Sequence, residues 1–527
     1  MMRTLVLTCL LSAPALAADP IFVTDNATSA NEAVWKLEDI NGDGDYNDAG
    51  EALKFYDDTL AGAIDLSNNS GVKVASDGSL FVCDSTIDIV LRIRDLNSDG
   101  DGNDAGEANV WFNGAPGGNA SGVVMASSNN LCVDAAGLVW VATAGASGGG
   151  NDAILRLQDL NNDGDANDLG EASEYYNINP GASTGAWIPT AVAVGPDGKV
   201  YYTENGNDAA LVKGVYRLND INNNGVIDSA AEALAYFLPT PGPTNNNFHW
   251  NLGVDAAGFF YLGDVTFEQI WKFKDQNGDG DAMDAGESLV WWQGAANSSL
   301  IWDFCFAADG SMLACETQTP DRILRLFDED CDGLISATEV SALYDETLQT
   351  AIGDVRGISR TGAHGRGASE FCFGDGILST LCPCGNFGTC RRGCENSGGT
   401  GGAKLRFSGA LFPDSAVLTC DGTLPTALSI VLQGNSLLAN PAVFGDGVRC
   451  VGGSLKRLYV KNAVGGIVSA PAAGDNSISA QSALLGDVIT PGSTRGYQIY
   501  YRDPSLAFCA SPTGNSWNVS NGVILTW

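Results

Sequence analysis

Short stretches in which apolar and polar residues alternate recur along the first two thirds of the chain. GVKVASDGSLFVCDS (residues 71–85) and AVAVGPDGKVYYTEN (191–205) each hold an Asp-Gly pair between two apolar runs. Alternation with a period of two predicts half-buried strands, and the Asp-Gly pair favours a tight hairpin turn. A third run such as IVLRIRD (89–95) and a fourth such as EANVWF (107–112) follow. Each repeat therefore predicts four short antiparallel strands.

An acidic segment lies between the third and fourth strand of every repeat, and it recurs six times at intervals of about 53 to 64 residues. Four-strand units at this period are typical of propeller blades. The first repeat lacks an innermost strand, because residues 20–26 correspond to the second strand of later repeats. Residues 352–360 follow the sixth acidic segment and match the missing strand. The pattern thus predicts a six-bladed ring that the strand at residues 352–360 closes by completing the first blade.

The acidic segments have the composition of calcium-binding loops. They carry oxygen side chains at alternate positions, a Gly at the sixth position and a late Glu, which together suit a cation that takes six to eight oxygens. Segment 328–339 has EF-hand spacing, with Glu at the twelfth position. The others place Glu at the thirteenth, which one inserted residue explains. A single copy could be an ordinary Asn/Asp/Gly turn, but six copies in register favour calcium (Ca2+).

The predicted metal ligands are the side-chain oxygens at the alternating and late positions of these loops. They are Asp39, Asn41, Asp43, Asp45, Asp48, Glu51, Asp95, Asn97, Asp99, Asp101, Asp104, Glu107, Asp159, Asn161, Asp163, Asp165, Asp168, Glu171, Asp220, Asn222, Asn224, Asp228, Glu232, Asp275, Asn277, Asp279, Asp281, Asp284, Glu287, Asp328, Asp330, Asp332, Ser336 and Glu339. Loop four is expected to bind most weakly, because Val226 and Ile227 interrupt its polar run and Asn224 replaces a carboxylate.

Charge supports a cation as partner. The formal net charge is -36, yet only 17% of residues are charged, so the acidity is concentrated in the loops. Nucleic acid is excluded as a partner, because phosphate binding needs clustered Lys and Arg.

Residues 1–17 read as a secretory signal peptide: one Arg, a short apolar run and small residues before a cut after Ala17. The run is too short to span a bilayer, and no later segment qualifies as a transmembrane segment. The mature protein is expected to be secreted, periplasmic or at the cell surface, where disulfides persist.

Fourteen Cys occur, and eight of them lie in the last third of the chain: Cys372, Cys382, Cys384, Cys390, Cys394, Cys420, Cys450 and Cys509. In a secreted module this set predicts a framework of up to four disulfides with undetermined pairing. A metal site is the alternative for the tight run 382–394, but no His lies within it. Cys305 and Cys315 flank a turn and could join neighbouring strands, which leaves Cys331 as the expected odd thiol.

Residues 18–362 resemble the six-bladed propellers of the NHL-repeat and gluconolactonase-like superfamily. The shared pattern is an apolar strand, Asp-Gly, an apolar strand that ends in an acid, and a strand with Arg; in this chain Asp77-Gly78 with Asp84 and Arg92 carry it. Residues 363–402 are expected to be a Gly/Cys-rich linker, and 403–527 a β-sandwich module whose cysteine framework starts near 370. This C-terminal part resembles a module of secreted planctomycete proteins of unknown role.

Acidic residues end the second strand in five of the six repeats: Asp25, Asp84, Glu204, Asp264 and Glu316. The resemblance implies that these ends face the mouth of the central channel, where related enzymes bind a catalytic metal through Glu, Asn and Asp. The alternative is that each acid caps a turn.

His249 and Trp250 precede an expected innermost strand, and Trp187 and Trp302 occupy similar connections. Together they could form a ligand-binding surface, since aromatic rings pack on apolar ligand faces, or they could plug the channel. Nucleophilic catalysis has little support, because the chain has two His and no G-x-S-x-G motif.

The sequence thus predicts an all-β protein, a six-bladed β-propeller followed by a disulfide-rich β-sandwich module. Its expected function is that of a secreted calcium-binding scaffold, with calcium mainly structural and a glycan or envelope protein as partner. The alternative is a metal-dependent lactonase-like hydrolase or sugar-oxidising enzyme, with its site near Glu204, His249 and Asp264.

Overall fold

The computed structural model describes residues 20–527 apart from short segments, namely 27–31, 42, 146–151, 178–187, 207–211, 240–247, 256, 296–299, 308, 318, 361–367, 377, 410, 412–413, 491 and 510–515. The expected signal peptide (1–17) and Trp187 lie outside the described residues.

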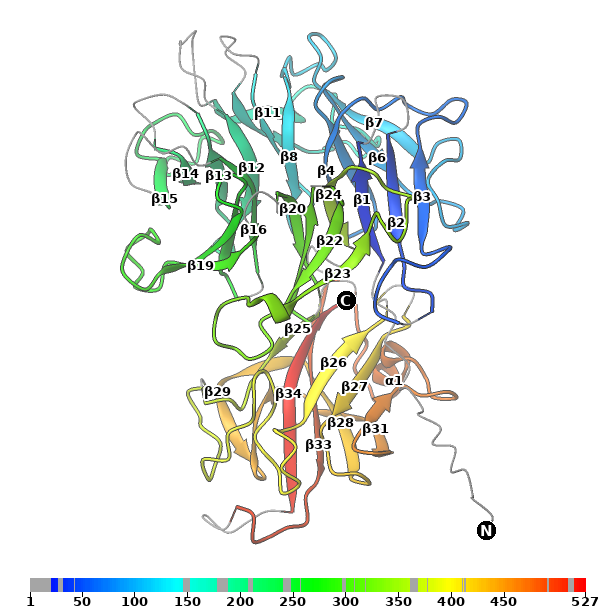
Figure 1. Ribbon diagram of the computed structural model, residues 1–527, viewed down its shortest axis with the longest axis vertical. Coiled ribbons are helices and arrows are strands. Elements are labelled where there is room, and N and C mark those ends of the chain that lie inside the picture. Colours follow the sequence, from blue (N-terminus) through cyan, green and yellow to red (C-terminus); the bar gives the residue numbers. More distant parts are fainter. Residues whose placement is uncertain are drawn as a thin grey trace, which may run out of the picture.

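The first part of the chain forms a six-bladed β-propeller (Figure 1). The described residues contain six four-stranded antiparallel sheets, each running from an innermost to an outermost strand. In that order blade one has β24 (Val355–Arg360), β1 (Ile21–Asp25), β2 (Ala33–Leu37) and β3 (Ala52–Asp57); blade two has β4 (Asn69–Val74), β5 (Leu80–Asp84), β6 (Ile89–Ile93) and β7 (Ala108–Asn113). Blade three has β8 (Ser128–Val133), β9 (Val139–Thr143), β10 (Ala153–Leu157) and β11 (Ala172–Asn177); blade four has β12 (Pro189–Val194), β13 (Val200–Glu204), β14 (Gly214–Leu218) and β15 (Ala233–Phe237). Blade five has β16 (His249–Val254), β17 (Phe260–Asp264), β18 (Gln269–Phe273) and β19 (Ser288–Gln293); blade six has β20 (Ile301–Phe306), β21 (Met312–Glu316), β22 (Arg322–Leu326), the 3-10 turn η1 (Ala337–Glu339) and β23 (Val340–Asp345).

The ring is closed by strands from both ends of the propeller sequence. β24 pairs with β1, with Ile21 opposite Arg360 and Val23 opposite Ile358. The innermost strands then contact one another in the cyclic order β24, β4, β8, β12, β16, β20 and back to β24. This confirms the prediction that residues after the sixth loop complete blade one.

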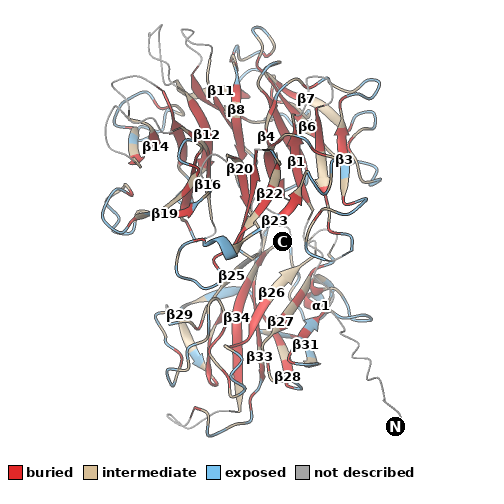
Figure 2. Ribbon diagram, viewed as in Figure 1, coloured by how far each residue is buried: buried red, intermediate tan, exposed pale blue. Residues whose placement is uncertain are grey.

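The propeller core lies between adjacent blades, where buried side chains of neighbouring sheets meet. Figure 2 colours most of the inner strands as buried. The second strand of each blade is buried at every position, as in β5 and β13. Such strands are covered on both faces, so they read as continuous apolar runs rather than as strict alternation.

The C-terminal module is a β-sandwich with a core of its own. Among its described residues a five-stranded sheet runs in the order β25 (Ala368–Phe371), β34 (Trp517–Thr526), β33 (Thr494–Arg502), β28 (Leu428–Gly434), β31 (Lys456–Asn462). A three-stranded sheet has β26 (Lys404–Ser408), β27 (Val417–Asp421) and β32 (Val468–Ala470), and β29 (Ser436–Phe444) pairs with β30 (Gly447–Gly452). Helix α1 (Ile478–Leu484) contacts β31, and its Ile478 belongs to the module's core. Because β25 pairs with β34, part of the expected linker is built into this module.

Four disulfides join the described cysteines, and they correct two expectations. The pairs are Cys331–Cys390, Cys372–Cys450, Cys382–Cys394 and Cys384–Cys509. The expectation that Cys331 is the odd thiol is therefore wrong, and the buried Cys420 remains reduced instead. Cys305 and Cys315 are also reduced, because the register sets Cys305 opposite Leu313 and Cys315 opposite Asp303.

Cys331 lies in the sixth acidic loop, so its bridge ties the propeller to the module. Beside it, Arg391 donates a hydrogen bond to the carbonyl of Asp309 at 2.8 Å. The cationic groups of Arg391 and Lys404 lie 4.8 and 5.4 Å from the centre of the Phe327 ring. Blade six and the module thus form a continuous contact (Figure 1). In the described part of the chain no helix is both long and apolar enough to cross a bilayer.

Candidate metal centres and the channel mouth

Each acidic loop connects the third and fourth strands of its blade, as the sequence predicts. In all six loops the first residue, an Asp, accepts the N–H of the Gly at the sixth position at 2.8–3.2 Å. These glycines have φ between +87° and +106°, a backbone conformation that side chains with a Cβ disfavour. The Gly at this position is therefore required by the turn.

The alternating side chains of the loops also act on the backbone. The third residue accepts the N–H of the fifth at 2.8–3.1 Å in every loop. The fifth residue accepts the N–H of the seventh at 2.8–3.3 Å. Each of these oxygens has a second lone pair that a cation could use, since such side chains are held but not saturated by one hydrogen bond.

The closing Glu of each loop is fixed from two sides. One carboxylate oxygen accepts the N–H of the loop's second residue at 2.6–3.1 Å. The other accepts the N–H of a residue three or four places earlier at 2.9–3.2 Å. The N–H of Asp228 lowers the pKa of Glu232 to about 2, and that of Ser336 lowers the pKa of Glu339. Both carboxylates are therefore ionised at neutral pH.

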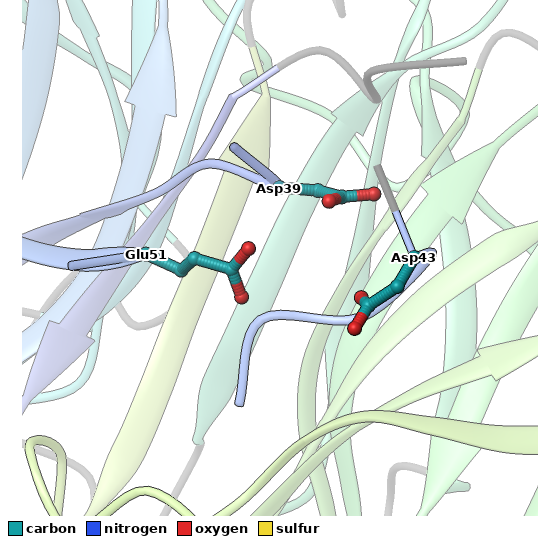
Figure 3. Close-up of side chains that lie close together, drawn as sticks. All are labelled: Asp39, Asp43 and Glu51. Atoms are coloured by element: carbon teal, nitrogen blue, oxygen red, sulfur yellow. The ribbon is translucent and has the colours of Figure 1, made fainter. Parts of the chain in front are cut away.

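Three loops bring three carboxylates together with spacing suited to one ion. In Asp39, Asp43 and Glu51 one oxygen of each lies within 4.8 Å of the others (Figure 3). Two oxygens that both lie 2.3–2.6 Å from calcium can be no more than about 5 Å apart, so this spacing fits. The corresponding groups are Asp99, Asp101 and Glu107 in loop two and Asp328, Asp330 and Glu339 in loop six.

Loop six gives a further sign that its residues fit a cation. Asp328 Oδ1 is buried and has no hydrogen-bond partner in the described part of the chain, while Asp328 Oδ2 accepts the N–H of Gly333 at 3.2 Å. Burial raises the pKa of Asp328, because a carboxylate removed from water needs another partner to compensate for the hydration that it loses. A calcium ion there would supply it.

Four of the five acids that end the second strands accept turn N–H groups in the described structure, whereas Glu316 accepts the Nε–H of Arg322 at 2.6 Å. Asp84 accepts the N–H groups of Ser67 and Asn68 at 2.6 and 2.8 Å, just before β4, and two more from the turn that follows β5. Glu204 accepts the N–H of Ile188 before β12 at 2.8 Å. Asp25 does the same for Asp354 before β24 at 3.1 Å. These bonds support the capping interpretation over a ring of metal ligands.

His249 is fully buried at the start of β16. Burial lowers its pKa to about 3, so the imidazole is neutral. Neither ring nitrogen has a hydrogen-bond partner among the described residues, nor do Asp264 Oδ2 and Glu204 Oε2. His249 Nε2 lies 3.9 Å from Asp264 Oδ2. Within the described ranges these three residues do not form a group with metal-ligand spacing.

A buried polar contact that the sequence pattern did not reveal crosses the channel. Lys73 of β4 donates to Asp303 Oδ2 of β20 at 2.6 Å and to the carbonyl of Ile358 at 3.2 Å. Asn130 Nδ2 of β8 donates to Asp303 Oδ1 at 3.4 Å. Blades three and six face each other across the ring, so this contact spans the channel. The signal in the sequence is a charged residue inside each of two innermost strands, Lys73 in β4 and Asp303 in β20.

The aromatic residues form a partly exposed cluster over blades five, six and one. Trp250 stacks with Phe248 (ring centres 5.4 Å apart) and meets Trp302 edge-on (4.1 Å). The Arg356 guanidinium lies 4.2 Å from the centre of the Trp302 ring. His249 does not join this cluster's surface, because its side chain is buried.

Comparisons with known proteins give structural likenesses at low sequence identity. No family model and no curated protein matches it. Streptogramin B lyase is similar in structure at 15% identity, with 54% of this chain and 70% of that chain covered and a TM-score of 0.33. A putative 6-phosphogluconolactonase from Bacteroides fragilis has 12% identity, with 77% of this chain and 91% of that chain covered and a TM-score of 0.39. PQQ-bound aldose sugar dehydrogenase from Streptomyces coelicolor has 14% identity, with 58% of this chain and 89% of that chain covered and a TM-score of 0.38. Likenesses this weak carry no argument about activity.

Proposed function

We propose that this protein is an extracytoplasmic, calcium-stabilised propeller that acts as a binding or surface-associated scaffold. The observation that carries the proposal is the hydrogen-bonded framework that all six acidic loops share, together with the carboxylates that converge in three of them. Unneutralised carboxylates at this spacing repel one another, and an ion removes that repulsion while it pins the loop. Calcium would be held by the alternating side chains and the closing Glu of each loop.

A structural rather than catalytic role is supported by the polar contact across the channel. The contact of Lys73, Asp303 and Asn130 links blades two, six and three, and four of the five strand-end acids cap turns. Two hollows on the described surface lie on loop five beside Asp284 and between β31 and helix α1.

The partner surface that we propose is the cluster of Phe248, Trp250 and Trp302. Partly exposed aromatic rings beside the Arg356 guanidinium suit a glycan or an envelope protein, because rings pack on the apolar faces of sugars while the cation and backbone bind hydroxyl groups. The C-terminal sandwich would attach the propeller to that surface. Four disulfides are consistent with an oxidising compartment.

The test is thermal unfolding at millimolar calcium and in chelator. A ligand that binds only the folded state raises the midpoint, and six weak extracellular-type sites with dissociation constants of roughly 0.1 to 1 mM would act together. We expect a midpoint well above that in chelator, with magnesium less effective. Equal midpoints would remove calcium's stabilising role.

The second candidate is a lactonase-like or sugar-oxidising enzyme, and one observation favours it: His249, Asp264 and Glu204 hold unpartnered polar atoms near the mouth, within the described residues. A screen of lactones and aldoses with the full chain, repeated with His249→Ala, tests this. Turnover that the variant loses would favour the enzyme over the scaffold.

A further inference from the structure

Every acidic loop is bonded to the neighbouring blade through the same backbone atom. In each loop the eighth residue is buried and donates its N–H to a carbonyl of the outermost strand of the preceding blade at 2.7–2.8 Å. The donor and acceptor pairs are Tyr46 to Leu343, Gly102 to Phe55, Ala166 to Trp111, Ile227 to Tyr175, Ala282 to Tyr236 and Ile335 to Trp291.

The accepting residue is also the same in every blade. It is the fourth residue of the outermost strand, and there the register of that strand against its neighbour shifts by one in all six sheets. In blade two, for example, Phe112 pairs with Val90 and Val110 with Leu91, so Trp111 between them is left out of the ladder. A bulged residue has backbone groups that its own sheet does not use. The bulge therefore supplies the acceptor for the loop of the next blade.

Three loops add a side-chain bond to this contact. Their ninth residue is an Asn whose Oδ1 accepts the N–H of the last residue of the same outermost strand. Asn47 accepts from Asp345 at 2.9 Å, Asn103 from Asp57 at 2.8 Å and Asn167 from Asn113 at 2.8 Å. Loop five has Met283 at this position, so it lacks the side-chain bond.

The contact from loop one also closes the ring. Tyr46, the largest of the eighth residues, packs in one cluster with Leu343 and Tyr344 of blade six. The seam between the first and last blades is thus joined twice, by β24 pairing with β1 at the centre and by loop one at the periphery.

We propose that the six loops are ion-dependent clasps between blades, so that calcium controls the cohesion of the whole ring and not only the hairpin that binds it. This inference rests on the proposed function. The eighth residue lies between predicted ligand positions on both sides. Before it come the fifth residue and, in four loops, an Asp at the seventh position; after it come a late Asp or Ser and the closing Glu. An ion that fixes both flanks therefore fixes the direction of this N–H, and the ion's loss frees the edge strand of the preceding blade.

Blade two and loop three offer the clearest test. The measurement is hydrogen–deuterium exchange of the full chain at millimolar calcium and in chelator, read at three amides. Gly164 reports the loop's own turn through its bond to Asp159, whereas Ala166 and Asn113 report the clasp. We expect chelation to speed exchange at all three, by about tenfold or more at the clasp amides, because local opening governs exchange.

The variant Asn167→Met copies the residue that loop five has at this position, and it changes no predicted ligand. We expect unchanged bound calcium and unchanged protection of Gly164, with calcium-dependent protection of Asn113 lost. The control Leu169→Ala alters a side chain in the same loop that is 82% exposed, and it should behave like the wild type. Protection by calcium that stops at Gly164 and does not reach Ala166 or Asn113 would overturn the clasp and leave calcium binding intact. Absence of bound calcium with no change at Gly164 would instead refute the proposed function, and the clasp with it.

Discussion

Replacing Lys73 with Met tests how the centre of the ring is held together. Lys73 and Asp303 come from blades two and six and form an ion pair at 2.6 Å, with side chains 13% and 5% exposed. Burial alone would lower the pKa of Lys73, because it disfavours the charged form. The adjacent Asp303 carboxylate outweighs this effect, so the pKa of Lys73 is raised. Lys73 therefore stays charged at neutral pH.

The size of the effect follows from what the substitution leaves behind. At an effective dielectric constant of about 20, unit charges at this distance attract by roughly 6 kcal/mol before the desolvation of both groups is subtracted. Removal of one partner strands the other charge in a buried site, which typically destabilises by about 3–5 kcal/mol. Asp303 keeps the N–H of Ile358 at 3.1 Å, so we expect a loss near the lower end, about 3 kcal/mol.

The assay is equilibrium unfolding in urea at saturating calcium. The matched control is Lys54→Met, which breaks an ion pair of similar length, 3.0 Å to Asp57, at a more exposed site; we expect a loss below about 1 kcal/mol. In the double variant Lys73→Met with Asp303→Asn, much of the loss should be recovered, because no charge is left unpaired. A single variant as stable as the control, or losses that simply add in the double variant, would refute this account of the channel.

Three further predictions concern the module, its contact with blade six and the weakest loop. Replacing Cys331 and Cys390 with Ser opens a loop of 59 residues. In the chain-entropy model this should lower the free energy of unfolding by about 4 kcal/mol. An unchanged free energy of unfolding in denaturant would contradict the bridge. Burial raises the pKa of Glu370 to about 7. The protonated carboxyl group therefore contributes fully to the free energy of unfolding below about pH 4.5. This contribution, at most about 3 kcal/mol, is lost as the pH rises through 7. Glu370→Gln should therefore flatten the fall in unfolding free energy between pH 5 and 8, and an unchanged slope would argue against it. Asn224→Asp restores a carboxylate to loop four and should raise its calcium affinity in calorimetry; weaker binding would contradict the assigned ligand position.

Much of the propeller could be predicted because its repeats mark their own boundaries. The Asp-Gly turns, the period of the acidic loops and the unmatched strand near Ile358 together defined six blades and their closure. The channel contact could not be predicted with the same means, since strand alternation does not reveal which polar side chains meet across a ring. Lys73 and Asp303 are 230 residues apart, and only the closed fold brings them together.

The bulges and the disulfide pairing could not be predicted for different reasons. Each bulge has a signal in the sequence: two consecutive large residues, such as Trp111 and Phe112, in a strand that otherwise alternates. The role of the bulged residue, however, depends on the loop of the next blade. Disulfide pairing depends on tertiary distance, and Cys331 lies in a different domain from its partner Cys390. Its position inside an acidic loop gave no sign that the C-terminal module packs beside that loop.

The most direct measurement of the central claim is the metal content of the purified, folded protein after equilibration in millimolar calcium. With weak sites retained by direct equilibrium dialysis, we predict about five to six calcium ions per chain, loop four being the first to empty as calcium falls. Essentially no bound calcium in folded protein under those conditions would contradict the claim that these acidic loops are metal sites.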